Sequence, residues 1–314
     1  MLLHATLPLE WVGPATVVAG LTAGGLIYAA GWRRYRRRLP GRFTGSHLAA
    51  FVGGLACLAI AIASPLDGAA DRLLSAHMVQ HMLLLTAAPA LLLLGEPLLP
   101  FLRGLPDPVR RTLVAPLLRR RSLRAAAHAL VHPLAALLLN SVIFWSWHLP
   151  ALYQLALRVP ALHLVEHASF LVGGLVFWYP VVLPWPGRPR WPSGAMIPYL
   201  LVADVQNTLL AAVLTFSDRV LYPFYEFRSR ATEVAALDDQ VLAGVIMWVP
   251  MSLAYLVPAA LLTIRLLSPV DRGLRTVAQR STARAPMADP TSECAPFRHR
   301  GSVMPVNPGI TRRS

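Results

Sequence analysis

Two short stretches of the chain carry the same pattern of side chains that can bind a metal ion. Both "HMVQH" at 77–81 and "HLVEH" at 163–167 have the form His-x-Val-[Gln/Glu]-His. Residues i, i+3 and i+4 share one face of a helix, so each stretch would present two imidazoles and one amide or carboxylate together. Imidazole is the commonest protein ligand for first-row transition metals. The pattern therefore indicates a metal site built from His77, His81, His163 and His167.

Three further side chains extend this candidate set. His148 ends the apolar run "NSVIFWSWH", and we expect it to lie in the same layer as the two pairs. Gln80 and Glu166 stand between the paired histidines, where they would bind the ion directly or fix the imidazole tautomers. The alternative for any single intramembrane histidine is a hydrogen bond between helices. Five histidines at one depth favour a functional site over helix packing, because burying so many polar side chains in a membrane costs free energy.

Two methionines and two aspartates complete the candidates. Met78 and Met82 adjoin the first histidine pair, and thioether sulfur favours Cu(I), although methionine is also a routine packing residue. Asp204 lies inside an apolar run, where an acid needs protonation, a partner or a cation. Asp238 begins the last run, where an acid also suits a helix N-terminus.

The composition identifies the elements that must position these residues. Of 314 residues, 55% are hydrophobic and 14% charged, and the mean hydropathy is +0.52, which indicates a membrane protein. Seven apolar segments are long enough to cross a hydrocarbon core about 30 Å thick. They cover residues 12–32, 47–65, 73–95, 131–149, 161–184, 195–216 and 240–267. The sequence predicts an all-α integral membrane protein, a seven-helix transmembrane bundle.

The arginines predict how this bundle is oriented. All 29 basic residues are arginines. The connections after the first, third and fifth segments hold six, seven and two of them, nine more lie from Arg265 to the C-terminus, and only five lie on the other side. Because arginines in short loops stay in the cytoplasm during insertion, we expect the N-terminus outside and the C-terminus inside. At 1.5 Å per residue, the two histidine pairs then lie within about 12 Å of the outer surface.

The remaining sequence features predict the domain limits and exclude some partners. We expect a seven-span membrane domain over 1–267 and a disordered cytoplasmic tail over 268–314, which is rich in Pro, Ser, Thr and Arg without apolar periodicity. The net charge of +14 is explained by loop arginines near lipid headgroups, so we expect no nucleic-acid partner. Cys57 and Cys294 offer neither a disulfide framework nor a cysteine zinc site. Interfacial-belt positions are expected for Trp145, Trp147, Tyr153 and Trp178.

Four blocks of sequence carry a resemblance to a known family. They are "HMVQHMLLLTAAPALLLLGEP", "WSWHLPALYQLAL", "LHLVEHASFLVGGLVFW" and "DDQVLAGVIMWVP". In this order they are similar to the multi-span CtaG-type cytochrome c oxidase assembly factors of bacteria, over roughly residues 45–267. The family usually has two prolines where this chain has Ala88-Pro89-Ala90, a departure that affects no candidate ligand. The five histidines are motif positions of this resemblance.

The resemblance implies a multi-pass protein of the bacterial plasma membrane that is not an enzyme. Its expected role is the assembly of an active haem-copper oxidase, with oxidase subunits and membrane lipids as partners. From the chemistry of the histidines we add a copper ion, held in the outer leaflet and passed on during assembly. Two alternatives stay open at this point, a haem-binding electron-transfer protein and a di-iron membrane oxygenase, since paired histidines serve both.

Overall fold

The described part of the chain is helical throughout. A computed structural model describes residues 14–189, 191–228 and 234–268, and these residues contain helices and no strands. All the helices belong to one compact unit, Met1–Leu267. The predicted disordered tail falls, apart from Ser268, outside the described residues.

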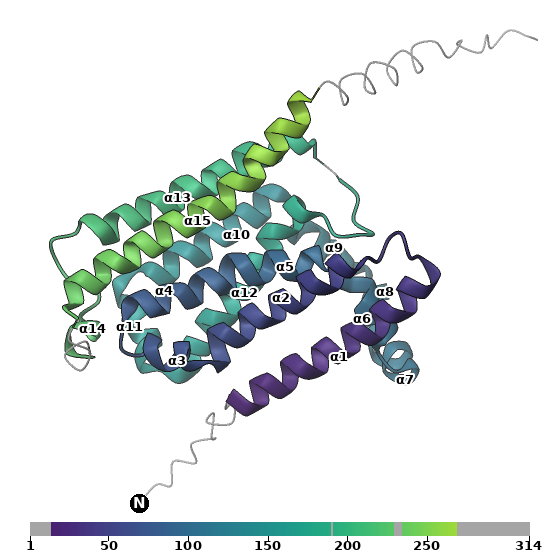
Figure 1. The fold of residues 1–314 in the computed structure, drawn as a ribbon, viewed down its shortest axis with the longest axis horizontal. Coiled ribbons are helices and arrows are strands. Elements are labelled where there is room, and N and C mark those ends of the chain that lie inside the picture. The colour runs from purple at the N-terminus through teal and green to yellow at the C-terminus, as the bar shows by residue number, and fades with distance from the viewer. Residues whose placement is uncertain (1–13, 190, 229–233, 269–314) are drawn as a thin grey trace, which may run out of the picture. The chain divides into compact units, whose positions relative to one another are not determined.

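Seven long helical segments correspond to the seven predicted apolar segments (Figure 1). They are α1 (Pro14–Arg38), α2 (Gly45–Ala63), α4 (Leu74–Met82) continued by η2 (Leu83–Ala87) and α5 (Ala88–Leu94), α10 (Pro133–His148), α12 (Pro160–Val182), α13 (Met196–Phe216) and α15 (Ala236–Leu267). Six of these are long and apolar enough to span a membrane. The shorter α10 qualifies only together with α9 (Arg121–Leu130), from which it is bent by 73°. The prediction of a helical membrane bundle is confirmed with six to seven candidate spans.

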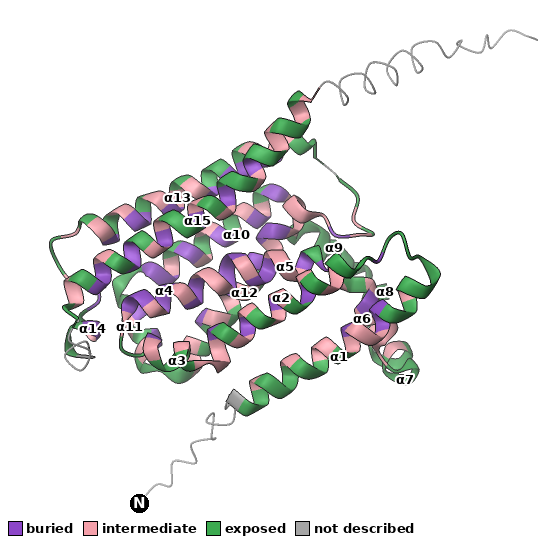
Figure 2. Ribbon diagram, viewed as in Figure 1, coloured by how far each residue is buried: buried purple, intermediate pink, exposed green. Residues whose placement is uncertain are grey.

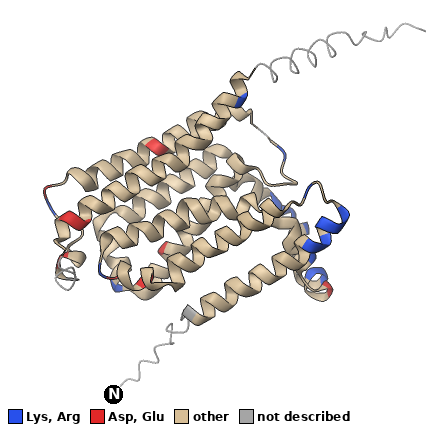
Figure 3. Cartoon of the chain, in the orientation of Figure 1, with Lys and Arg blue, Asp and Glu red and all other residues tan. Residues whose placement is uncertain are grey.

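Short helices close the two ends of the bundle. We call one the α14 end; it carries α3 (Pro65–Ala70), α11 (Pro150–Arg158) and α14 (Pro223–Arg228). At the other, the arginine-rich end, lie α6 (Leu98–Gly104), α7 (Asp107–Val109), η3 (Arg110–Val114), α8 (Ala115–Arg119), α9 and η4 (Ser193–Ala195). Figure 3 shows the basic residues concentrated near α6 to α8 and several acidic ones near α3 and α14. The charge asymmetry read from the sequence is therefore an asymmetry between the two ends of the bundle.

The outward faces of the long helices are apolar, and the bundle interior contains the aromatic and polar side chains. Leu138, Leu209 and Leu253 are each more than half exposed, at 66%, 55% and 57%. Figure 2 shows such exposed positions along the outer surface of the bundle helices. A contiguous apolar surface of this size would favour aggregation in water, whereas lipid tails cover it without penalty. The burial pattern thus agrees with a protein embedded in a membrane.

A close contact joins α12 to the segment that continues α4, and so links the two helices that carry the histidine pairs. Pro89 has no N–H, so the carbonyl of Leu85 loses the donor that an α-helix would supply from that position. The Trp178 indole of α12 donates to this carbonyl at 3.2 Å. A Cβ added at Gly174 would lie 2.5 Å from the same oxygen, so only glycine permits this approach. A π-helical turn, η2, lies directly before Pro89.

The burial of three aromatic residues corrects the prediction that they lie in an interfacial belt. Trp147, Tyr153 and Trp178 are buried, at 7%, 0% and 2% exposure, and are not members of an interfacial belt. Trp147 donates to the Ser169 hydroxyl at 2.7 Å, which joins α10 to α12. Apolar flanks in the sequence do not distinguish an indole facing lipid from one that bridges two helices, because both sit at similar depths.

Candidate metal centre

Three helices bring five histidines together near the α14 end. His77 and His81 lie in the first turns of α4, His163 and His167 in the first turns of α12, and His148 is the last residue of α10. The α12 helix begins with Pro160 at a position where a missing N–H is harmless, and α11, which begins with Pro150, turns the chain from α10 into it. Because α4 and α12 both begin at this end, their histidines share one depth, as the sequence predicts.

The imidazole rings touch one another across the helices. The ring centroids of His77 and His163 are 5.2 Å apart, and those of His77 and His167 are 5.8 Å apart. His81 lies 5.6 Å from His167 and 5.9 Å from His148. The five rings therefore form one continuous cluster, which we call the histidine cluster.

Two overlapping sets of atoms in this cluster have spacings that suit a metal ion. One ligand atom each from His77, His81 and His167 lie within 4.8 Å of one another, and the same holds for His77, His163 and Glu166. The Glu166 side chain is fully buried, and its Oε1 lies 3.5 Å from His81 Nε2. Imidazole nitrogens with one carboxylate are a donor set for a transition metal.

The polar atoms of the cluster are unusual because the described residues offer them no hydrogen bond, although Glu166 Oε1 lies 3.5 Å from His81 Nε2. The Nε2 atoms of all five histidines are buried without a hydrogen bond, and so are both carboxylate oxygens of Glu166. Buried side-chain polar atoms in folded proteins nearly always have a hydrogen-bond partner. A metal ion would supply a common partner to these nitrogens, which a set of histidines used only for helix packing would not need.

Hydrogen bonds behind two of the rings leave Nε2 free to bind a metal ion. His148 Nδ1 donates to the Phe144 carbonyl at 2.7 Å, so its Nε2 keeps the lone pair. His77 Nδ1 lies 2.7 Å from the Tyr225 hydroxyl, which donates its proton to the Ala70 carbonyl at 3.1 Å. With the Tyr225 proton on the Ala70 carbonyl, His77 Nδ1 donates to Tyr225, and in this tautomer His77 Nε2 keeps its lone pair. Such outer contacts orient the histidine ligands of metal sites.

A layer of tyrosines covers the cluster on the side of α11 and α14. Tyr153 and Tyr225 are buried, and their hydroxyls are 3.3 Å apart. Burial raises the pKa of both phenols above the usual value, so both remain protonated and neutral. Tyr222 donates to the His148 carbonyl at 2.9 Å. The "YPFYEF" segment around α14 thus lies directly against the cluster.

The other predicted candidates have different surroundings. The Gln80 amide donates to the Ala61 carbonyl at 2.6 Å and to Asp67 at 2.9 Å, away from the rings. Met78 is fully buried in the apolar core, against which Met82 packs half-buried. Asp204 is half-buried in the middle of α13, and its Oδ1 has no partner.

The aspartate pair at the start of α15 differs from the expectation. Asp238 is exposed, whereas the neighbouring Asp239 is buried. The Asp239 carboxylate accepts hydrogen bonds from the backbone N–H groups of Leu74 at 2.6 Å and Ser75 at 3.2 Å. It therefore caps the N-terminus of α4, the helix that carries His77 and His81. The sequence contained both acids in this place but no signal for which one turns inward.

Together these features define a multi-pass helical membrane protein with a buried histidine cluster near one end. The chain belongs to the cytochrome c oxidase caa3 assembly factor family, whose model matches residues 26–268 and so includes all five histidines. The family resemblance read from the sequence is confirmed. The family is described as one of cytochrome c oxidase assembly factors.

Two relatives come from mycobacteria. Uncharacterized proteins of Mycobacterium bovis and Mycobacterium tuberculosis are each 28% identical to the chain over 281 residues. The match covers 87% of this chain and 40% of each relative, so the chain spans well under half of their length. No solved structure matches the chain.

Proposed function

We propose that this protein holds a copper ion at the histidine cluster and passes it to a subunit of a haem-copper oxidase during assembly. One observation carries the proposal: five buried Nε2 atoms from three helices converge without a hydrogen-bond partner. In this function copper is cargo, and no reaction is catalysed. The buried histidines would bind the ion, and His148 and His77, whose Nδ1 atoms are engaged elsewhere, would present Nε2 to it.

Charge favours Cu(I) over a divalent ion in this site. Glu166 contributes one carboxylate, and a single positive charge would be neutralised by it. A divalent ion would leave one positive charge uncompensated inside the membrane, where isolated charges are expensive. Met78 and Met82 adjoin the site but pack in the core, so this preference rests mainly on Glu166.

The proposed transfer takes place on the outer side of the plasma membrane. The arginines gather at the opposite end of the bundle, which supports an outer location for the α14 end under the positive-inside rule. His163 is partly exposed at the start of α12 and is the ligand that a partner could reach first. We expect a reporter fused after Arg38 to be cytoplasmic and one inserted near Arg219 to be extracytoplasmic. A cytoplasmic signal from the second fusion would contradict this orientation.

The geometry disfavours the haem alternative. Axial histidines of a haem stand on opposite faces of the macrocycle. In the histidine cluster the rings of His81 and His167, on facing helices, are only 5.6 Å apart at their centroids. Each of these two helices also carries two histidines of the cluster, one more than axial ligation of a haem uses. The di-iron alternative gains no support either, because Glu166 is the one carboxylate in the two candidate ligand sets.

Substitution of His81 in cells tests the proposal. We expect His81→Ala to abolish oxidase maturation while the protein remains in the membrane, because the change removes a metal ligand but little packing. His128→Ala is the matched control, since His128 is exposed at the arginine-rich end. Oxidase activity and membrane abundance would be measured together. Equal effects of the two variants, or loss of the His81→Ala protein from the membrane, would favour a purely structural histidine cluster.

A further inference from the structure

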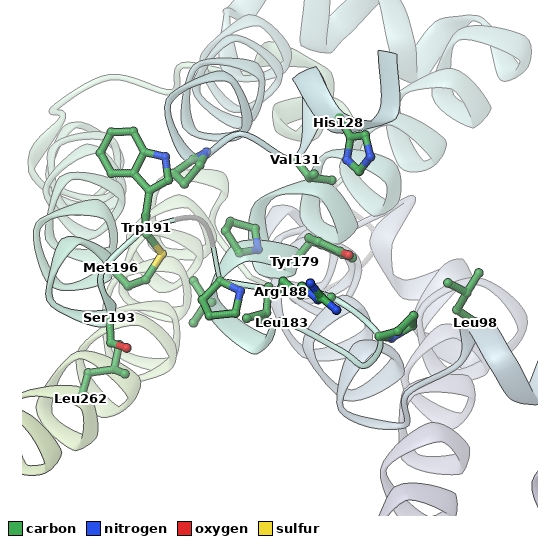
Figure 4. Close-up of a pocket in the computed structure, with 16 residues that line it drawn as sticks. Leu98, His128, Val131, Tyr179, Leu183, Arg188, Trp191, Ser193, Met196 and Leu262 are labelled. Atoms are coloured by element: carbon green, nitrogen blue, oxygen red, sulfur yellow. The ribbon is translucent and has the colours of Figure 1, made fainter. Parts of the chain in front are cut away.

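A cavity of about 520 Å³ lies at the arginine-rich end, far from the histidine cluster. It is enclosed by the last turn of α9, the end of α12, the 183–189 connection, the start of α13 and Leu262 of α15. Figure 4 shows His128, Tyr179, Arg188 and Trp191 among the residues that surround it. The function proposed above makes no use of this space.

The polar groups of the cavity are suited to an anion. Arg188 is exposed and carries a fixed positive charge, and it forms no ion pair with a described residue. The Tyr179 hydroxyl, which lies against Gly187, adds a neutral donor on the same side of the cavity. Among the described residues that line the cavity, none is acidic. An arginine with a neighbouring donor and no competing carboxylate is typical of phosphate recognition.

The local backbone holds these donors in place. Gly187 donates to the Pro184 carbonyl at 2.9 Å, which closes a tight turn directly before Arg188. A Cβ at Gly187 would lie 3.2 Å from the Tyr179 hydroxyl and 2.8 Å from the Pro184 carbonyl, so this turn packs on Tyr179. The Trp191 ring stands edge-on to His132, with centroids 5.3 Å apart. The turn at 184–187 therefore places Arg188 next to Tyr179.

A second, apolar cavity adjoins the first. It has a volume of about 420 Å³ and shares Leu98 and Tyr179 with the cavity that contains Arg188. Its walls come from α2, α5, α6 and α12 and from Trp185. Phe51 and Phe101 are among the apolar side chains that line it. A ligand with an anionic head and a hydrocarbon chain could occupy both spaces at once, whereas a free anion would leave the second one empty.

The helix α9 places this site at the membrane surface. Because α9 is bent by 73° from α10, it lies nearly in the membrane plane when α10 crosses the membrane. Arg121 and Arg124 share one face of α9, and Leu123 and Leu130 share the opposite face, with 41% and 46% exposure. This distribution is typical of an amphipathic helix at the boundary between headgroups and acyl chains. The mouth of the cavity is thus at headgroup level.

We propose that the two cavities form a binding site for an anionic phospholipid. The lipid phosphate binds Arg188, with Tyr179 as a further donor, and one acyl chain lies in the apolar cavity beside Phe51 and Phe101. The site differs from general lipid contact, which covers the exposed leucines on the outer faces of the bundle. It is independent of metal binding, which takes place at the other end.

Native mass spectrometry of the full-length protein in detergent tests this site. Phosphatidylglycerol and phosphatidylethanolamine would be added at equal concentration, and the bound lipid counted. We expect phosphatidylglycerol to be retained about tenfold better, because the ammonium group of phosphatidylethanolamine offsets the charge of its phosphate beside Arg188. Arg188→Gln should abolish this preference, and Tyr179→Phe should reduce it.

Arg119→Gln is the matched control, because Arg119 is exposed at the same end but does not line the cavity. It should keep the full preference for phosphatidylglycerol. If Arg119→Gln and Arg188→Gln behave alike, the preference comes from general surface charge and the proposed site is wrong. Displacement of phosphatidylglycerol by an equal concentration of glycerol phosphate would also overturn the proposal, since it would mean that the acyl chain contributes nothing.

Discussion

The histidines at the two ends of the bundle differ in what their ring nitrogens contact. At the arginine-rich end, His47 completes a capping box at the start of α2, where its Nδ1 accepts from the Thr44 backbone at 3.2 Å. His132 precedes α10 and packs on Trp191, and His128 is exposed. His47 thus caps a helix, His132 packs on an aromatic ring and His128 is open to the surroundings.

At the α14 end, the histidines face one another instead. Their Nε2 atoms are buried and without partners, and Glu166 lies among them in the same condition. Histidine in a helical membrane protein is therefore no sign of a metal site by itself. The histidine cluster differs because its rings converge from three helices and their Nε2 atoms have no hydrogen-bond partner among the described residues. The substitutions below distinguish such a cluster from histidines that only pack between helices.

The largest expected effect comes from Glu166→Gln compared with Glu96→Gln. Glu166 is buried without hydrogen bonds, and an ionised carboxylate there costs more to bury than a neutral amide of similar size, so Glu166→Gln should stabilise the metal-free protein by about 1–3 kcal/mol. The same change should lower copper retention, because the compensating charge is lost. Thermal unfolding in detergent and metal analysis of the same samples measure the two effects.

Glu96 provides the opposite case at the arginine-rich end. Its Oε1 pairs with the half-exposed Arg42 at 3.0 Å, whereas its Oε2 is buried without a hydrogen bond to a described residue. Glu96→Gln should lower stability by about 1 kcal/mol through loss of this ion pair and leave copper retention unchanged. A destabilised Glu166→Gln protein would mean that the Glu166 carboxylate is satisfied in a way that these contacts do not include, and the contrast between the two ends would fail.

A smaller effect is expected from Asp239→Ala compared with Asp238→Ala. Asp239 caps α4, and loss of such a cap typically destabilises by about 1–2 kcal/mol. The first turn of α4 should then exchange its amide hydrogens faster, and His77 should be held less firmly. Asp238 is exposed, so its replacement should change stability by less than about 0.5 kcal/mol. Equal effects of the two substitutions would show that the capping contact does not position α4.

The spans and the level of the histidines could be predicted from the sequence, because both depend on local patterns. Apolar length sets each span, and the i,i+4 spacing puts His77 beside His81 and His163 beside His167. The two pairs meet because α4 and α12 start at the same end. The direction of Gln80 could not be predicted, since α2 and α3 offered its amide better partners.

Other parts of the site depend on tertiary packing that the sequence does not express. Asp238 and Asp239 are adjacent acids at one helix start, and only the rotation of α15 against α4 decides which carboxylate turns inward. The contact of Tyr225 with His77 joins residues 148 positions apart. Trp178 is buried because Pro89 leaves the Leu85 carbonyl free on the neighbouring helix. Each of these depends on how two helices face each other.

Metal retention by the purified protein tests the central claim most directly. The reduced wild-type protein and a variant with all five cluster histidines replaced by alanine would be loaded with Cu(I), dialysed against a competing chelator and analysed for bound copper. The account predicts that the wild type retains about one copper ion per chain and the variant none, as expected for one shared site. If both proteins retain the same amount, or if neither retains any, the histidine cluster is not a copper site.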